Sequence, residues 1–71
     1  MIIKNCIFEL RKPIKVTQAE LADIVGVTRQ TIVSLENGRY TASLPLAYKI
    51  AKFFNKTIEE VFTFEEGEEN D

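Results

Sequence analysis

The chain has 71 residues, of which 45% are hydrophobic and 28% are charged, and its formal net charge at pH 7 is −2. A chain this short has room for one domain with one small core. Its longest apolar run falls well short of the roughly 18 residues that a membrane-spanning helix needs. Its first residues show no secretory signal pattern. We therefore expect a small globular protein without a membrane segment, acting in the cytoplasm.

The side-chain inventory excludes most kinds of catalytic site. The sequence contains no histidine and a single cysteine, Cys6. Without histidine there is no Ser-His-Asp triad, no Cys-His pair and no His-ligated metal, and one thiol cannot build a multi-thiolate zinc site. A lone thiol suits a reducing compartment, and we interpret Cys6 as a small core residue. We expect no enzyme activity, no metal and no cofactor.

The charges are unevenly distributed along the chain. Residues 1–64 hold all nine basic residues and six acids, a net charge of +3, whereas residues 65–71 (EEGEEND) hold five acids. Because acidic runs at a terminus are usually solvated and disordered, the sequence predicts one domain over 1–64 and a disordered acidic tail over 65–71. The low pI, about 5.1, argues against a nucleic-acid binder, since such domains are usually strongly basic.

Capping and terminating residues predict five short helices. The first ends before Pro13, whose ring and missing N–H stop a helix. Capping boxes of the form Thr-x-x-Glu begin helices after Thr17 and Thr57, and N-caps begin two more after Thr28 and Ser43. Residues able to adopt the left-handed conformation close three of them. The predicted helices are 5–12, 18–25, 29–37, 44–54 and 58–62, with Gly26, Gly38 and Asn55 as the three closing residues.

The apolar residues of these segments mark inner faces. Segment 44–54 has the i, i+3, i+4, i+7 spacing of a helix with one buried face. The two ends, 1–3 and 62–64, can each form a short extended segment, and the two can pair. The sequence thus predicts an all-α fold around one core. The expected core residues are Leu21, Ile24, Val25, Ile32, Leu35, Ala47, Ile50, Ala51, Phe54, Ile58, Val61 and Phe62.

Residues 18–37 have the form of a helix-turn-helix, two helices joined by a three-residue turn. Ala22 supplies a small side chain where the helices cross, and Gly26 can adopt the positive φ that the turn needs. Apolar residues on both helices hold the pair at a fixed angle. A second helix held in this way presents its first residues to the major groove of DNA.

Taken together, the runs 17–18, 26–32 and 35–38 resemble the Cro and phage-repressor type of helix-turn-helix regulator, in its stand-alone bacterial or archaeal form. The resemblance covers residues 5–62 and implies a compact five-helix, lambda-repressor-like DNA-binding domain. The sequence departs from the family pattern at Pro13 and Lys15, where members more often have a charged residue and a glycine.

The resemblance implies that the first residues of helix 29–37 lie against base edges. Arg29 has a guanidinium that can bind guanine O6 and N7, and Gln30 has an amide that matches adenine N6 and N7. The alternative is an ordinary solvated helix face. The expected base-reading residues are Arg29, Gln30, Ser34, Thr28 and Val33. The expected phosphate contacts are Gln18, Thr31, Asn37, Arg39 and Tyr40, to which Lys12 and Lys15 can add charge.

In the same family, residues matching Arg11 and Glu36 form a largely buried ion pair between the first helix and the end of the third. We therefore interpret Glu36 as structural, although it lies in the segment that faces DNA. Breaking one partner of such a pair costs about 3–5 kcal/mol, because the other charge is left buried and alone.

We expect double-stranded DNA as the partner and a homodimeric repressor as the functional form, since two domains about 34 Å apart can read a palindrome. The interface is expected to use apolar residues beyond the needs of the core, namely Leu46, Phe53 and Phe64, with Tyr48 as a further contributor. A second hypothesis is a protein-interaction module, such as an antitoxin that neutralises a protein partner, because the tail is acidic.

Overall fold

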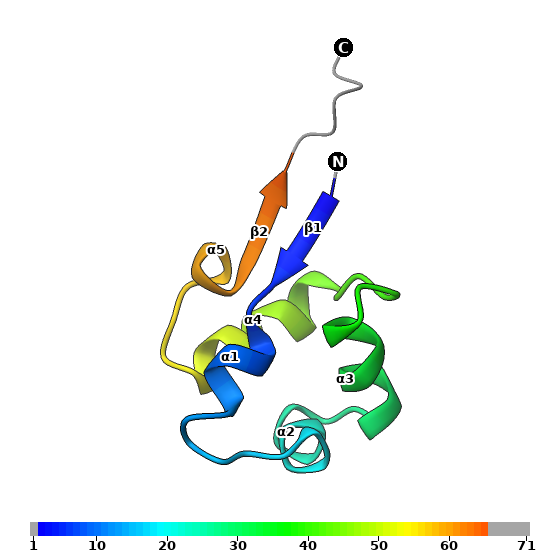
Figure 1. The fold of residues 1–71 in the computed structure, drawn as a ribbon, viewed down its shortest axis with the longest axis vertical. Coiled ribbons are helices and arrows are strands. Elements are labelled where there is room, and N and C mark those ends of the chain that lie inside the picture. Colours follow the sequence, from blue (N-terminus) through cyan, green and yellow to red (C-terminus); the bar gives the residue numbers. More distant parts are fainter. Residues whose placement is uncertain (1, 66–71) are drawn as a thin grey trace.

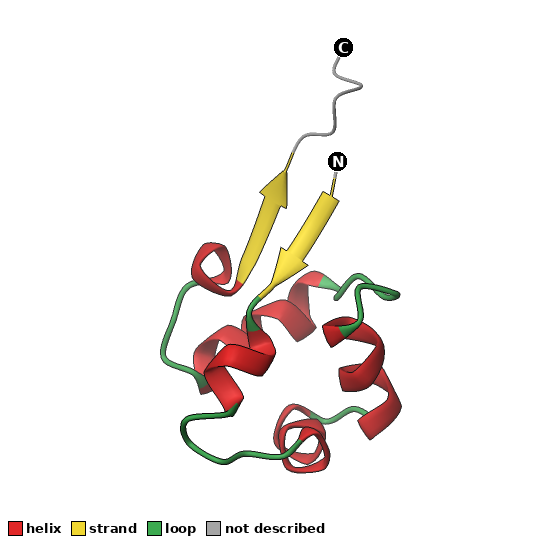
Figure 2. Cartoon of the chain, viewed as in Figure 1, coloured by secondary structure: helices red, strands yellow, loops and turns green. Residues whose placement is uncertain are grey.

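The computed structural model describes residues 2–65, which form a helical body with two short strands projecting from one end (Figures 1 and 2). None of the helices described is long and apolar enough to cross a membrane. The elements in chain order are β1 (Ile2–Asn5), α1 (Ile7–Arg11), α2 (Gln18–Val25), α3 (Arg29–Glu36), α4 (Leu44–Phe53), α5 (Ile58–Val61) and β2 (Phe62–Glu65).

The helices begin where the predicted caps lie. Thr17 and Thr57 each form a complete capping box with the Glu three residues later, Glu20 and Glu60. In both boxes the Thr backbone N–H donates to the Glu carboxylate at 2.8 Å, and the Thr hydroxyl accepts from the Glu N–H. Ser43 caps α4 through a 3.3 Å bond from the N–H of Leu46. Each cap satisfies backbone donors that a helix start leaves free.

Positive φ angles occur at Lys15, Gly26, Gly38 and Asn55 among the described residues, and each follows a helix. Gly26, Gly38 and Asn55 were the predicted closing residues. At Lys15 (φ 59°) the turn after α1 closes in the same way, with the N–H of Val16 donating to the carbonyl of Arg11 at 3.2 Å. Lys15 therefore takes the left-handed conformation at the position where the family resemblance predicts glycine.

One core fills the space between the helices, and its membership differs in part from the predicted one. Phe54 and Ile58, predicted inside, are half-buried and pack against the core, and Ile7 and Ala22 belong to it in addition. Ile24 was predicted inside but is 54% exposed, and Cys6 is only half-buried before the start of α1. Leu46, predicted as surplus, is only 6% exposed. The buried hydrophobic residues are Ile7, Leu21, Ala22, Val25, Ile32, Leu35, Leu46, Ala47, Ile50, Ala51, Val61 and Phe62.

The prediction of an all-α fold was inexact, because the two extended ends pair as an antiparallel two-stranded sheet. In its register Ile3 lies opposite Phe64, and Asn5 opposite Phe62. Directly opposed residues share one face of a sheet, so Ile3, Phe62 and Phe64 lie on one face, on which Phe62 is buried in the core and Phe64 is 60% exposed. Asn5 was predicted to begin a helix but ends β1 instead. Glu65, predicted as the first residue of a disordered tail over 65–71, belongs to β2 instead, and the rest of that predicted tail, 66–71, lies outside the described residues.

Candidate nucleic-acid interface

The turn between α2 and α3 is held by one backbone oxygen. The carbonyl of Ala22 accepts from the N–H of Gly26 at 2.8 Å and from the N–H of Val27 at 2.9 Å. Gly26 has a φ of 82°, a conformation that residues with a Cβ rarely adopt. Apolar side chains from both helices enter the core on either side of this turn. The angle between α2 and α3 is therefore set by backbone hydrogen bonds and by packing together.

The first two residues of α3 have exposed side chains. Thr28 caps the helix by accepting from the N–H of Thr31 at 3.3 Å. Arg29 and Gln30 are exposed, as the base-reading interpretation requires. Gln30 Nε2 lies 3.3 Å from the hydroxyl of Ser34, its neighbour one turn later. Arg29 and Gln30 therefore share an accessible surface, and Val33 and Ser34 beside them are half-buried.

Four side chains form a continuous hydrogen-bonded chain from α1 to the tip of α3. Nε of Arg11 donates to Oε2 of Glu36 at 2.7 Å, and Nη2 donates to Oε1 at 3.0 Å. Gln18 Nε2 donates to the same Oε1 atom at 3.0 Å. The Oε1 atom of Gln18 accepts from Nη2 of Arg29 at 3.3 Å. The Gln18 amide thus joins the ion pair to the candidate base reader.

The Arg11–Glu36 pair is the inner end of this chain. Its two side chains are only 12% and 9% exposed, and the remaining Nη1 of Arg11 donates to the carbonyl of Val16 at 3.0 Å. The hydrogen bond to Glu36 raises the pKa of Arg11 above its ordinary value against the opposing effect of burial, and the charge of Glu36 adds to the rise. A bidentate arginine–carboxylate pair is geometrically rigid, so Glu36 is a fixed acceptor for Gln18.

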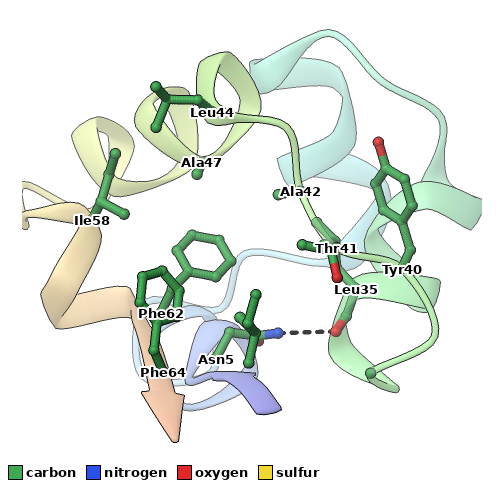
Figure 3. Close-up of a pocket in the computed structure, with 12 residues that line it drawn as sticks. Asn5, Leu35, Tyr40, Thr41, Ala42, Leu44, Ala47, Ile58, Phe62 and Phe64 are labelled. Atoms are coloured by element: carbon green, nitrogen blue, oxygen red, sulfur yellow. Dashed lines mark hydrogen bonds between the residues drawn. The ribbon is translucent and has the colours of Figure 1, made fainter. Parts of the chain in front are cut away.

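The segment after α3 carries the remaining expected phosphate contacts. Asn37 and Arg39 are exposed. The N–H of Arg39 donates to the carbonyl of Ser34 at 2.9 Å, and Gly38 between them has a φ of 77°. Tyr40 is about half exposed and lines a cavity of about 200 Å³ beside the loop that follows α3 (Figure 3). Its side chain therefore belongs partly to that cavity.

The sequence reasoning missed two long-range contacts that position the site. One is the bond between Gln18 and Glu36. The other joins Asn5 Nδ2 to the carbonyl of Leu35 at 2.9 Å, drawn as the dashed line in Figure 3. It connects the end of β1 to the last turn of α3. The paired residues lie 18 and 30 positions apart, so no local spacing signals them.

The predicted dimer residues lie in three different environments. Leu46 is buried in the core of its own chain, so its interpretation as a surplus apolar residue was wrong. Phe53 is half-buried and packs edge-on against Phe54, with ring centroids 4.9 Å apart. Phe64 is 60% exposed, and Tyr48 and Leu44 are also exposed. Leu44 was not predicted, although it lies one turn before Tyr48 on the same side of α4.

A helix-turn-helix family model matches residues 7–61. The chain belongs to the helix-turn-helix family, in its Cro and phage-repressor form. This family consists of DNA-binding regulators of transcription, and the match includes every element from α1 to α5.

Small proteins of archaea and bacteria resemble this helix-turn-helix chain over nearly their whole length. One from Archaeoglobus fulgidus is 56% identical over 66 residues, covering 93% of each chain. One from Methanocaldococcus jannaschii is 47% identical, covering 93% of this chain and all of its own. One from Bacillus subtilis is 47% identical over 64 residues, covering 90% and 97%. All three bear the name of uncharacterized HTH-type transcriptional regulator.

Proposed function

We propose that this protein is a sequence-specific regulator of transcription that reads the major groove of DNA with the first turn of α3. The observation that carries the proposal is the position of Arg29. Its side chain is exposed at the start of α3, yet a hydrogen bond to Gln18 connects it to a buried ion pair. A solvated surface arginine does not need such support, whereas a base-reading arginine gains from being pre-positioned.

The geometry leaves Arg29 free to bind a base. A guanidinium has five N–H donors, and Gln18 engages only Nη2. The other donors can form the paired bonds to O6 and N7 of guanine, which are worth about 1–3 kcal/mol of discrimination. In this proposal Gln30 and Ser34 read the next positions, and Thr28 and Val33 contact thymine methyl groups.

The surrounding residues fit contacts with the DNA backbone. Gln18 is the first residue of α2, where free N–H groups and the helix dipole attract a phosphate. Asn37 and Arg39 follow α3 at its other end, so phosphate contacts would lie on both sides of the reading turn. Such contacts set the register of a protein on the duplex. Thr31 and Tyr40 complete the proposed set.

We further propose that two copies bind a palindromic operator in the cytoplasm and repress transcription by covering a promoter. One domain of this size contacts only a few base pairs. Two domains related by a two-fold axis read two half-sites about one helical turn apart. The names of the relatives support a role in transcription.

Selection from random duplexes, followed by binding titrations, tests base reading. Arg29→Ala should weaken binding to the selected site at least about tenfold and binding to random DNA much less, because the proposed contact that it removes is to a base. Lys4→Ala, which removes a positive charge from the projecting strands, is the matched control and should affect both duplexes little. Equal losses on the selected and random duplexes with Arg29→Ala would refute base reading.

A further inference from the structure

An apolar cavity of about 200 Å³ lies between the paired strands, the loop after α3 and α4. In Figure 3 the rings of Phe62 and Phe64 stand on one side of it, and Thr41 and Ala42 lie across from them. Phe62 is 6% exposed and Phe64 is 60% exposed, so the cavity reaches from the core to the surface. Side chains around a hollow of this size lack van der Waals contacts on one side, and a fitting apolar molecule would supply them.

The lining determines the chemistry of the molecule that fits. Among the described residues, the twelve that line the cavity are mostly apolar or aromatic and include no charged side chain. A charge buried without a partner is costly, so the lining favours a neutral ligand. The amide of Asn5 is already engaged, by the carbonyl of Leu35 and the N–H of Ile7. Thr41 adds an exposed hydroxyl to the lining, with which one polar group of a ligand can form a hydrogen bond.

The volume limits the size of the ligand. Pockets for drug-sized molecules have volumes of about 300–1,000 Å³, which is more than this cavity offers. An apolar cavity of about 150 Å³ holds benzene, so one of about 200 Å³ holds a ring with small substituents. We propose that the cavity binds a neutral effector with a single substituted aromatic ring, and that this effector strengthens DNA binding. The second step rests on the proposed function.

The cavity adjoins the segment that is proposed to contact DNA phosphates. Gly38 and Tyr40 both line it, and Arg39 lies between them in the chain. Leu35 in the last turn of α3 lines it as well, and Asn5 connects that turn to β1 through the bond drawn in Figure 3. A ligand packed against these residues favours the loop conformation to which it binds. The proposed function assigns DNA reading to this conformation, so ligand and duplex should each raise the affinity for the other.

The probe for the site is p-cresol, a neutral ring with one methyl and one hydroxyl group. Its titration into the full, isotope-labelled chain without DNA should shift the amide NMR signals of Leu35, Ala42 and Ala47. The Kd should lie below about 1 mM, which is an ordinary affinity for so small a ligand. The matched control is p-toluate, whose carboxylate replaces the hydroxyl and should prevent binding. No shift of these signals at about 5 mM p-cresol would overturn the proposal, and so would equal binding of the two compounds.

Two exposed phenylalanines test the location of the site. Phe64→Ala removes one wall and should weaken p-cresol binding at least about fivefold. Phe8→Ala is the matched control and should leave the affinity unchanged, because Phe8 is 46% exposed on α1, outside the lining. Ala42→Leu, at a half-buried position of the lining, fills the hollow and should abolish binding. Equal affinities in Phe64→Ala and Phe8→Ala would show that p-cresol binds elsewhere.

The coupling to DNA is measured with the selected duplex. Saturating p-cresol should raise the affinity of the wild-type chain for this duplex at least about threefold and leave that of Ala42→Leu unchanged. An unchanged affinity in the wild-type chain would overturn the coupling.

The titrations without DNA keep the two proposals apart. A chain that binds p-cresol but fails to discriminate between duplexes would refute the proposed base reading and leave the ligand site intact. A chain that discriminates between duplexes but does not bind p-cresol would refute the ligand site alone.

Discussion

Gln18 and Glu36 connect the core of the protein to its proposed DNA-reading turn. The amide Nε2 of Gln18 lies 3.0 Å from the carboxylate Oε1 of Glu36, which Arg11 already holds in place. Because the carboxylate accepts this bond, the amide is oriented with its oxygen toward Arg29. A residue that sequence reasoning assigns to structure, Glu36, thereby bears on the orientation of the proposed reader through one intermediate side chain.

Replacing Gln18 should reduce sequence discrimination. In Gln18→Ala, Arg29 loses its brace and Glu36 loses one donor, so we expect the affinity for a selected site to fall about tenfold, as for a hydrogen bond to a charged group. Titrations of selected and random duplexes measure the effect. In the Arg29→Ala background, Gln18→Ala should affect DNA binding only through the proposed phosphate contact and lower the affinities for both duplexes equally. If Gln18→Ala reduces discrimination in that background as much as it does in the wild-type chain, Gln18 does not act through Arg29.

Breaking the ion pair should destabilise the fold. Arg11→Met leaves the carboxylate of Glu36, 9% exposed, with only the Gln18 amide as a side-chain partner. We expect a loss of about 3–5 kcal/mol in the free energy of unfolding, measured by urea titration at low temperature. Combining Arg11→Met with Glu36→Leu should restore part of that loss, because no unpaired charge remains buried.

The exposed pair of Lys4 and Glu65 is the control for this comparison. Its atoms are 3.5 Å apart, and its side chains are 63% and 46% exposed. Lys4→Met should change stability by no more than about 1 kcal/mol, since water screens such a pair. Similar losses at both pairs would show that burial does not govern the strength of the Arg11–Glu36 pair.

Lys15 offers a stabilising substitution. Its left-handed φ of 59° crowds its Cβ against the backbone, which costs about 1–2 kcal/mol in a residue other than glycine. Lys15→Gly removes that crowding but makes the unfolded chain more flexible, so we expect a net gain of up to about 1 kcal/mol. In a chain of this length, each kcal/mol of added stability raises Tm by about 4–8 °C.

Ile14→Gly is the matched change one residue earlier. Ile14 is exposed and has no positive φ, so glycine there should bring flexibility to the unfolded chain with no relief of strain. A drop in Tm for Lys15→Gly as large as that for Ile14→Gly would contradict the assignment of strain to Lys15.

The features that the sequence predicted well are those determined within a few residues. Each helix start at Thr17, Thr28, Ser43 and Thr57 depends on a side chain that bonds a backbone N–H three positions later. Such bonds form wherever the residue types occur at that spacing. The left-handed Lys15 was harder to predict, because the residue type disfavours the conformation that the turn imposes.

The features that the sequence did not fix depend on how distant elements pack. Ile24 and Leu46 are both apolar residues within helices, yet Ile24 on α2 is exposed to water and Leu46 on α4 is buried in the core. Periodicity gives the width of an apolar face only within about one residue at its edges. The contacts of Asn5 with Leu35 and of Gln18 with Glu36 follow from tertiary arrangement alone.

Salt dependence separates the proposed backbone contacts from the base contacts. Affinity for any duplex should fall steeply with salt, because each phosphate neutralised by Lys or Arg releases counterions. Arg39→Gln should lower affinity for selected and random duplexes about equally and reduce the slope of log K against log salt by about 1. Lys4→Gln, on the projecting strands, should leave the slope unchanged. If the slope of log K against log salt in Arg39→Gln equals that of the wild-type chain, Arg39 does not contact a phosphate. If the affinity of the wild-type chain does not change with salt, DNA is not the partner, because binding to a duplex involves its charged backbone.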